Sequence, residues 1–525
     1  MHSRIVTRNN DTPMLKSPGK IDLLVLAGLS LSLFVYHILT STLSSYGYFI
    51  DEFYYIACSK HLALGYVDHP PMSVFLLALS RLLFGDSIPA LRVFPALAAS
   101  ATVYMTGLTV RRLGGSRMAL VIAALAVIAV PVYLLMGSFY SMNAFEPLIW
   151  MSILYCIIRL VQEEDPRYWL VVGVLMGIGL ETKHTMAVYA AALIAGMVLT
   201  KARRLLWNRW LVLGVLACFI LLLPNLIWQY ASGFPSVEFY RNAMVNKNVP
   251  RGPVNVVLDQ ILFANPLALP LWITGLFFFF VAQDARKLRF LGWAYIVLLI
   301  LMVLSQSSRP DRIAAMYTVL FAGGAVAIDK LERPLMLRLV RAAMIVVVVG
   351  GAIVVAPVAT PLLPPPALRN YLSAIGFSFS IERGKMNEPI PQWLADRLGW
   401  RELAVDVAQV YRSLPAEEQK NTVIVSTNYG EAGALELYGA DFGLPRVYAT
   451  HNSYHLWGPP PDSIKTYIGV FVDGADLAKR FESVVEAAVH TCDDCTRPQR
   501  RIPIYVARGP KFSISKEWPK FKIYD

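Results

Sequence analysis

The sequence has few charged residues for its length. Only 16% of its 525 residues are Asp, Glu, Lys or Arg, and 56% are hydrophobic. A soluble chain carries closer to a quarter charged residues. The shortage excludes an ordinary soluble protein and indicates a membrane protein with a polar appendage. The net charge of +12 comes with no Lys/Arg-rich helix and no RNA-binding signature, so we expect no nucleic-acid partner.

Cysteine is also scarce, with five residues in the chain. A structural zinc site takes four ligands, which the single Cys492-x-x-Cys495 motif does not supply. In an oxidising compartment this pair would form a small disulfide loop, and the sequence alone leaves the point open. Cys58, Cys156 and Cys218 lie in or near apolar segments and are interpreted as packing residues.

Long apolar runs, in contrast, are abundant between residues 21 and 359. A membrane-spanning helix takes about 20 apolar residues. The first run is preceded by basic residues and followed by no small-residue cleavage site, which predicts a retained signal anchor. About eleven spans are predicted, at 22–44, 88–109, 118–136, 144–160, 169–181, 185–200, 211–228, 264–282, 290–305, 313–328 and 341–359.

The loops between these runs predict an orientation. Alternate loops are rich in Lys and Arg, as cytoplasmic loops usually are; the loop at 161–168 fits least well. The N-terminal tail, residues 1–20, is therefore expected in the cytoplasm. The basic loops contain Arg111, Arg112, Arg117, Lys201, Arg203, Arg204, Arg209, Arg286, Lys287, Arg289, Lys330, Arg333, Arg338 and Arg341. The pattern predicts a multi-pass protein of a bacterial inner membrane whose C-terminal part is periplasmic.

A proline-rich stretch at 357–366 separates two domains. We expect a transmembrane domain at 21–359 and a small extracytoplasmic α/β domain at 367–525. Strands alternate with helices in the second region, which is typical of α/β domains. The predicted helices are 391–413, 430–439 and 475–490, and the predicted strands are 423–425, 467–472 and 502–507.

The first long outer loop, 45–87, contains the acidic pair Asp51-Glu52. A carboxylate there could take a proton from a sugar or protein hydroxyl, or the pair could simply be solvated. Neighbouring carboxylates repel each other, so a cation or divalent metal could lie beside them. Tyr54 and Tyr55 would suit sugar stacking or an interfacial aromatic belt. His69 could touch a phosphate or a metal, or be solvated.

These residues carry a resemblance. Asp51-Glu52-x-Tyr54-Tyr55, followed by Gly65-Tyr66-x-Asp68-His69-Pro70-Pro71, resembles the first loop of bacterial members of the dolichyl-phosphate-mannose protein mannosyltransferase family. This family belongs to the GT-C superfamily, and the aminoarabinose transferase that modifies lipid A is a relative. The resemblance covers roughly residues 20–330, including 182–185 and 309–312. Residues 428–434 and 451–459 resemble the tail of one bacterial subgroup.

The resemblance implies a polytopic GT-C fold and an inverting glycosyltransferase. The implied donor is a polyprenyl-phosphate sugar in the membrane lipid, and the acceptor is a protein, a lipid such as lipid A, or a polysaccharide. Asp51, beside Glu52, would be the base that activates the acceptor hydroxyl. A second acid is expected in the next outer loop. Asn143 stands at that acidic position, and Glu146 follows three residues later. His69 stands where the lipid A branch has a lysine.

Four basic residues are candidates for binding the donor phosphate: Lys183, His184, Arg309 and Arg312. Lysine between two apolar spans is costly unless it is solvated or paired, and arginine grips phosphate through a planar fork. Lys183 could neutralise the leaving phosphate, or it could reach to interfacial water. The two arginines could equally form a salt link to Asp311 or to a loop acid.

Further aromatic and polar residues are candidates for contacting substrate. Tyr240 lies in the outer loop 229–263, which is either a lid or acceptor wall or part of an aromatic belt. Glu431, His451 and Trp457 in the C-terminal domain could contact carbohydrate, with packed loop residues as the alternative.

Two other functional classes compete with glycosyl transfer. A transporter or flippase of lipid-linked sugars should carry ionisable residues at mid-span and often shows inverted repeats. Here the charges gather in outer loops. A non-catalytic envelope assembly protein would use the outer domain for binding only, and it would not depend on Asp51.

Overall fold

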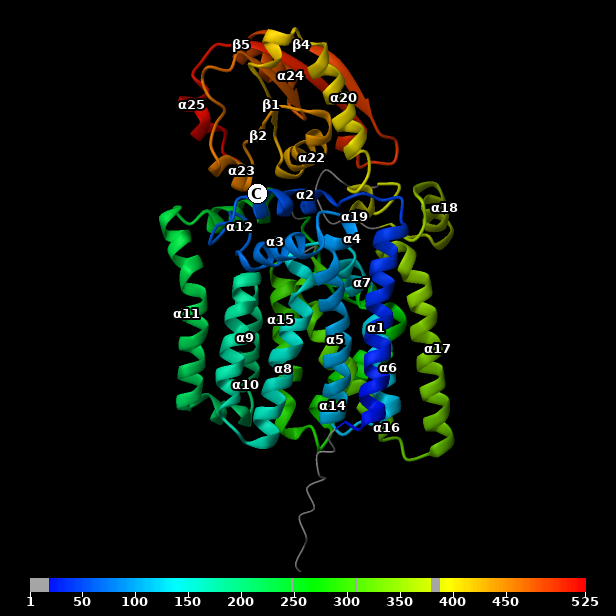
Figure 1. Cartoon of the computed structure of the whole chain (residues 1–525). Helices are drawn as coiled ribbons and strands as arrows, with labels where there is room; N and C mark the ends of the chain where they lie inside the picture. The colour runs from blue at the N-terminus through cyan, green and yellow to red at the C-terminus, as the bar shows by residue number, and fades with distance from the viewer. Residues whose placement is uncertain (1–17, 247–248, 307–308, 379–387) are drawn as a thin grey trace, which may run out of the picture.

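The computed structural model describes residues 18–525 except 247–248, 307–308 and 379–387. A bundle of roughly parallel helices forms one part of the molecule, and a smaller α/β domain sits on one end of it (Figure 1). Most of the predicted N-terminal tail lies outside the described residues. The expected fold class, a helical membrane protein with a C-terminal α/β region, is confirmed.

The bundle consists of long apolar helices. Seven helices of the described chain are long and apolar enough to cross a membrane, and up to nine if each of two bent pairs counts as one span. Every predicted run falls on one of these helices, on a bent pair or on the shorter α9 and α10. Four of the seven are single α-helices: α1 (Lys20–Leu43), α5 (Val93–Arg112), α11 (Arg209–Ala231) and α17 (Pro334–Ala359). The other three reach this length together with the 3-10 turn before them: α8 (Glu146–Glu163) in the span Met142–Glu163, α15 (Arg289–Leu304) in Arg286–Leu304, and α16 (Tyr317–Asp329) in Pro310–Asp329.

The remaining bundle helices are short or bent. Helix α6 (Arg117–Ile128) meets α7 (Pro131–Gly137) at 65°, and α13 (Pro253–Phe263) meets the segment Pro266–Val281, which contains α14 (Leu269–Val281), at 90°. Proline starts the second member of each pair, where its ring disrupts the preceding turn. Helices α9 (Tyr168–Thr182) and α10 (Met186–Val198) are shorter apolar helices.

Three helices lie across the end of the bundle instead of along it. They are α2 (Ile50–Lys60), α3 (Met72–Phe84) and α12 (Pro235–Asn246), and they separate the bundle from the outer domain (Figure 1). They come from the two long outer loops of the sequence. These segments are therefore largely helical, and α2 carries Asp51 directly under the outer domain.

The outer domain is built on a five-stranded mixed sheet with the order β2-β1-β3-β5-β4. The first three of these strands are parallel, and β5 is antiparallel to both β3 and β4. The strands are β1 (Thr422–Ser426), β2 (Val447–Ala449), β3 (Thr466–Val470), β4 (Phe481–Thr491) and β5 (Arg501–Pro510). Helices α20 (Trp400–Ser413) and α22 (Tyr429–Gly439) pack together, and α22 also packs on α2.

Two predicted helices of this domain differ in the structure, and the short strand β2 has no counterpart in the prediction. The helix predicted at 475–490 is a short helix, α24 (Gly474–Arg480), followed by the long strand β4. Glu and Ala favour a helix locally, but Val484 and Val485 pair with β5, and such pairing overrides propensity. The helix predicted at 391–413 is interrupted after α19 (Gln392–Ala395) by Gly399, whose φ of 76° a helix interior excludes.

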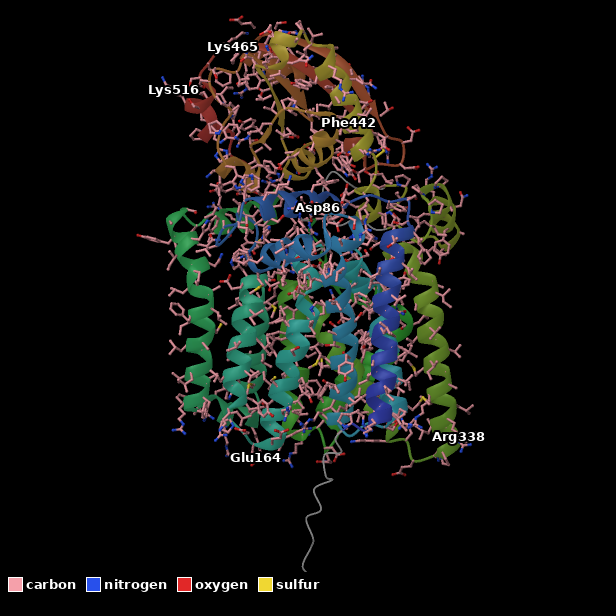
Figure 2. All side chains as sticks on the ribbon, viewed as in Figure 1. Asp86, Glu164, Arg338, Phe442, Lys465 and Lys516 are labelled. Carbon is pink, nitrogen blue, oxygen red and sulfur yellow. A yellow bond between two sulfur atoms is a disulfide. The ribbon has the colours of Figure 1, made fainter. Side chains whose placement is uncertain are left out.

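The basic loops gather at the end of the bundle opposite the outer domain. Asp22 accepts ion pairs there from Arg117 (2.8 Å) and Arg111 (3.3 Å). Glu164 and Arg338 mark that end, whereas Lys465 lies at the far side of the outer domain (Figure 2). The charge asymmetry that the sequence shows is therefore an asymmetry of the folded molecule.

A disulfide joins Cys492 and Cys495 between β4 and β5. Both sulfurs lie against Gly399, where an added Cβ would meet them at 3.0 and 2.9 Å. Three residues before Gly399, the carbonyl of Asp396 accepts a 3.1 Å hydrogen bond from Ile50 N. The disulfide loop thus packs on the segment that holds the start of α2.

Candidate active site

Asp51 stands in the first turn of α2, where the helix dipole favours a negative charge. Its side chain is half-buried, and Oδ1 accepts a 3.0 Å hydrogen bond from Tyr429 Oη. Tyr429 is the first residue of α22 in the outer domain. The carboxylate is therefore held by both parts of the molecule at their junction.

Asp51 lines a cavity of about 340 Å³ between the bundle and the outer domain. Ligand sites are typically concave and of this size or larger, with a few convergent polar groups. The polar groups here include both signs of charge. Its ionisable or amide lining residues include Asp51, Asn143, Arg309, Asp311, His451 and Asp525.

Glu52, next in the chain, points elsewhere. It is fully buried and receives two hydrogen bonds from Arg92, at 2.8 and 2.7 Å, and one from Tyr140 N at 2.7 Å. Burial alone would raise the pKa of Glu52, but the charge and hydrogen bonds of Arg92 hold it below its ordinary value. Glu52 is not among the residues lining the cavity, which differs from its predicted place beside Asp51 in the reaction.

Lys183 and Glu146 form a buried ion pair. Lys183 Nζ lies 2.8 Å from Glu146 Oε2 and 4.0 Å from Asp311 Oδ2, and 8% and 2% of the two paired side chains are exposed. Lys183 therefore does not reach to interfacial water. Asn143, and not Glu146, lines the cavity, and its Oδ1 has no hydrogen-bond partner among the described residues.

The two predicted arginines occupy different places. Arg309 lines the cavity together with Asp311. Arg312 lies in the following 3-10 turn, η5 (Pro310–Met316), is half-buried and is not among the lining residues. Asp311 faces both the cavity and Lys183, so a chain of alternating charges connects the cavity to the buried pair.

His184 and Tyr240 contact each other beside this cluster. His184 Nδ1 lies 3.3 Å from Tyr240 Oη, and Nε2 lies 3.1 Å from Asn225 Oδ1. Helix α12 thus closes over the turn between α9 and α10. The structure brings these two predicted residues together, although neither lines the cavity at Asp51.

Tyr54, Tyr55 and His69 form the packed interior of the layer under the outer domain. The Tyr55 ring stacks on His69 with 4.7 Å between centroids. Tyr54 Oη lies 2.8 Å from Asp68 Oδ1 and 2.7 Å from Ser453 Oγ. Burial raises the pKa of both phenols. Tyr54 and Tyr55 belong to α2, and their side chains and that of His69 pack in the interior and do not line the cavity.

The three candidate residues of the outer domain lie in three different places. Glu431 accepts hydrogen bonds from Ser426 Oγ (2.8 Å) and Asn428 N (3.1 Å), as a capping residue of α22. His451 lines the cavity, and its Nε2 lies 3.1 Å from Asp525 Oδ1. Trp457 lines a different cavity of the outer domain.

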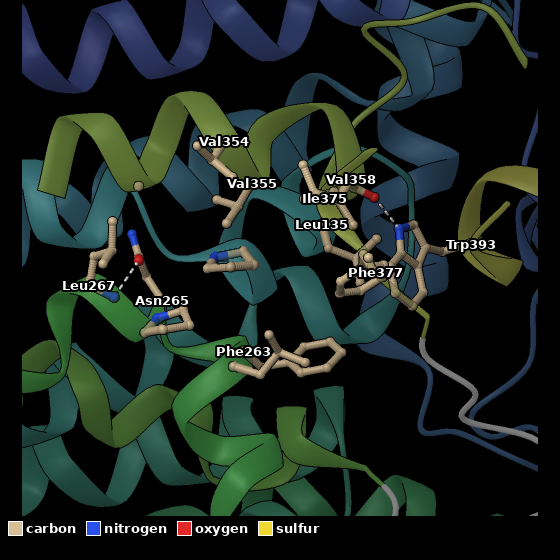
Figure 3. Close-up of a pocket in the computed structure, with 16 residues that line it drawn as sticks. Leu135, Phe263, Asn265, Leu267, Val354, Val355, Val358, Ile375, Phe377 and Trp393 are labelled. Atoms are coloured by element: carbon tan, nitrogen blue, oxygen red, sulfur yellow. Dashed lines mark hydrogen bonds between the residues drawn. The ribbon is translucent and has the colours of Figure 1, made fainter. Parts of the chain in front are cut away.

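An apolar cavity of about 370 Å³ adjoins the site. It lies between α7, α13, α17 and the residues that end α18 (Pro365–Ile375) (Figure 3). Leu135, Phe263 and Trp393 line both cavities. Trp393 is fixed by a 2.7 Å hydrogen bond from Nε1 to Val358 O. A polar chamber and an apolar one thus share a wall.

The described residues offer no ligand set for the divalent metal that the sequence suggests beside Asp51 and Glu52. No group of three or more His, Cys, Asp or Glu residues there is arranged to hold a metal ion.

Sequence reasoning missed three residues of the site. Tyr429 holds Asp51, Arg92 neutralises Glu52, and Asp525 lines the cavity. Gly430 and Gly433, one turn apart in the segment 428–434, indicate that the helix carrying Tyr429 packs closely against another element. An added Cβ on these glycines would meet Ile50 Cγ1 at 2.2 Å and the backbone carbon of Phe53 at 2.8 Å, so small residues there permit the close approach of α22 to α2.

Comparison with known proteins gives the same architecture. The sequence profile of the dolichyl-phosphate-mannose-protein mannosyltransferase family matches residues 68–228. ArnT from Cupriavidus metallidurans, solved in the apo state and bound to undecaprenyl phosphate, superposes with a TM-score of 0.57 at 15% identity. The match covers 92% of this chain and 97% of ArnT. An oligosaccharyltransferase from Archaeoglobus fulgidus gives a TM-score of 0.51 at 12% identity, over 81% of this chain and 63% of that one.

Fold and similarities define a GT-C-type membrane protein. Within that class, a curated relative is the undecaprenyl phosphate-alpha-4-amino-4-deoxy-L-arabinose arabinosyl transferase 1 of Pseudomonas fluorescens (strain Pf0-1). It is 24% identical over 260 residues, which amount to 46% of this chain and 44% of the relative. The chain thus matches less than half the length of that relative. The chain therefore has a GT-C-type fold, is similar to this one aminoarabinose transferase over part of its length, and matches the mannosyltransferase family profile at residues 68–228.

Proposed function

We propose that this protein is an inverting glycosyltransferase that moves a sugar from a polyprenyl-phosphate carrier to an acceptor hydroxyl. The observation that carries the proposal is one cavity with a carboxylate, Asp51, and a guanidinium, Arg309, on its walls. Two similar proteins support a polyprenyl-phosphate donor: one is an undecaprenyl-phosphate aminoarabinosyl transferase, and the other was solved bound to undecaprenyl phosphate. The acceptor would be a lipid, a polysaccharide or a protein.

Asp51 would act as the general base. Its carboxylate would take the proton of the acceptor hydroxyl while that oxygen attacks the anomeric carbon of the donor sugar. The bond from the anomeric carbon to the phosphate oxygen would break on the opposite side, and its electron pair would leave with polyprenyl phosphate. Glu52 would act as a positioning residue, since its contacts are with Arg92 and backbone amides around the start of α2.

The leaving phosphate would be met by positive charge. Arg309 lies on the cavity wall, and Lys183 and Arg312 lie behind it, with Asp311 between the cavity and Lys183. Fixed charges in a site with little water stabilise developing charge strongly. The adjoining apolar cavity is suited to the first isoprenoid units of the donor, because its lining is aliphatic and aromatic.

The proposed location is a bacterial inner membrane, with the N-terminus in the cytoplasm and the α/β domain in the periplasm. Support comes from the basic loops at the end of the bundle opposite that domain. The reaction cavity would then open on the outer face of the membrane.

Transfer by Asp51→Asn protein in lipid nanodiscs tests the proposal. A panel of radiolabelled polyprenyl-phosphate sugars is supplied with membrane extract as acceptor. We expect wild type to transfer one sugar, and Asp51→Asn to be slower by about 100-fold or more because the amide cannot take the proton. Asp476→Asn, an exposed carboxylate of the outer domain, is the matched control and should keep full activity.

Two outcomes would contradict the proposal. Equal transfer by wild type and Asp51→Asn would remove Asp51 as the base. Binding or flipping of a donor by wild type without any transfer would favour the transporter instead.

A further inference from the structure

A separate cavity of about 410 Å³ lies in the outer domain at its junction with α2. Its walls come from α22, from the segment that leads into β2, from the end of α23 (Asn452–Leu456) and from His61 at the end of α2. The volume is within the usual range for small-ligand sites. None of the residues that line the cavity at Asp51 lines this one.

Aromatic side chains make up one wall of this cavity. The Trp457 ring lies 4.4 Å from the His61 ring, nearly parallel to it, and 4.5 Å from the Tyr454 ring. These contacts fix the indole, and Trp457 remains partly exposed to the cavity. An indole has a large apolar face and one N–H donor, which matches the mixed apolar and hydroxyl surface of a sugar ring.

The lining of this cavity also carries a positive charge, that of Arg446. The Arg446 guanidinium is exposed and lies 4.8 Å from the centroid of the Tyr448 ring. Among the described residues no carboxylate pairs with it. The acid in the same cavity, Glu436, is already bound by Lys60 Nζ (3.1 Å) and Tyr454 Oη (2.8 Å). A guanidinium on the cavity lining without a carboxylate partner in the part of the chain that the structure describes favours an anion.

We propose that this cavity binds a saccharide that carries a carboxylate or a phosphate group. The sugar ring would pack on Trp457, and the guanidinium of Arg446 would hold the anion in its planar fork. Asp51 and His61 lie at the two ends of α2, about 15 Å apart at the usual rise per residue. The cavity is therefore suited to a distal sugar of the acceptor; this assignment to the acceptor rests on the proposed transferase function, whereas saccharide binding itself does not.

Saturation-transfer NMR on the full-length protein in nanodiscs tests the proposal with three matched sugars: glucuronate, glucose 6-phosphate and glucose. They share one ring and differ in the charged group. We expect both anionic sugars to bind at least about tenfold more tightly than glucose, since a hydrogen bond to a charged group is worth about 1.5–3 kcal/mol. Arg446→Gln should abolish this preference, and Trp457→Ala should weaken all three. Arg446 is exposed, so its replacement should not impair folding.

Asp51→Asn separates this site from the reaction. It should leave the preference for anionic sugars unchanged, so binding can succeed even if the transferase proposal fails. Equal binding of glucuronate and glucose by wild type would overturn the proposal. An anion preference that survives in Arg446→Gln would also overturn it, because the anion would then bind elsewhere.

Discussion

Asp51 depends on a phenol that lies 378 residues further along the chain. The carboxylate could be singled out from sequence only through the resemblance of its motif to the mannosyltransferase family, because an acidic pair in an outer loop can also be simply solvated. Its neighbour Glu52 could not be told apart from it. The partner of Glu52 is Arg92, forty residues away and fully buried, and pairing at such separation is decided by packing that no local pattern encodes.

The Glu52–Arg92 pair predicts an acid-sensitive structure. The folded-state pKa of Glu52 lies below its ordinary value, so the pair contributes stability that is complete above the unfolded pKa, about 4.3. This contribution is lost as the pH falls further, through the folded-state pKa. We expect the melting temperature to decrease below about pH 4. The double variant Glu52→Gln/Arg92→Gln should lose part of that dependence, measured as Tm between pH 7 and 3.5; an unchanged profile would contradict the assignment.

Variants of the Lys183–Glu146 pair can distinguish a role of Lys183 in stability from a role in donor binding. Lys183→Met leaves Glu146 buried without its cation, and breaking such a pair costs about 3–5 kcal/mol. The double variant Lys183→Met/Glu146→Gln should regain most of this stability in thermal unfolding. If Lys183 also meets the donor phosphate, the double variant should still show a donor KM raised about tenfold. A normal donor KM in the stable double variant would leave Lys183 with a structural role only.

At the level of elements, the contact between α2 and α22 positions the site. Replacing Gly430 by Ala would put a methyl group 2.2 Å from Ile50 Cγ1, closer than any real contact. We expect Gly430→Ala to displace α22, to remove the Tyr429–Asp51 hydrogen bond and to lower kcat about tenfold, since bonds to charged groups are worth 1.5–3 kcal/mol. Gly350→Ala in α17, where the new methyl meets nothing within 4 Å, is the control. Full activity in Gly430→Ala would show that the contact is dispensable.

Apolar runs long enough for a helix could be located from the sequence, because hydrophobic length is a local property. The strand β4 could not. Its Glu-Ala-rich sequence favours a helix in isolation, and only pairing with β5, which follows later in the chain, makes it a strand. The crosswise helices α2 and α12 lie in segments that the sequence predicts as outer loops. Helix α2 packs on α22 of the outer domain, and most of α12 is not buried, so neither shows the long apolar run that marks a spanning helix.

At the level of the whole molecule, the distribution of charge predicts which end faces which compartment. Lys465 and Arg338 are exposed at opposite ends (Figure 2). In a background with Cys156 and Cys218 replaced by Ser, Lys465→Cys should react with a membrane-impermeant maleimide in cells whose outer membrane is permeabilised. Arg338→Cys should react only after the inner membrane is opened. The reverse labelling pattern would invert the proposed topology.

The hydrogen bond between Tyr429 and Asp51 also has a consequence in time. Asp51 leaves the ribosome early, but its partner follows 378 residues later, which at 5–20 residues per second is a delay of roughly 20 to 75 s. During that interval the bundle can insert into the membrane while the cavity at Asp51 still lacks the lining residues that come from the outer domain. Under the proposed function, a nascent chain would therefore be in the membrane with its carrier lipid before Asp51 has its partner, and the order of synthesis would postpone activity until the last domain has folded.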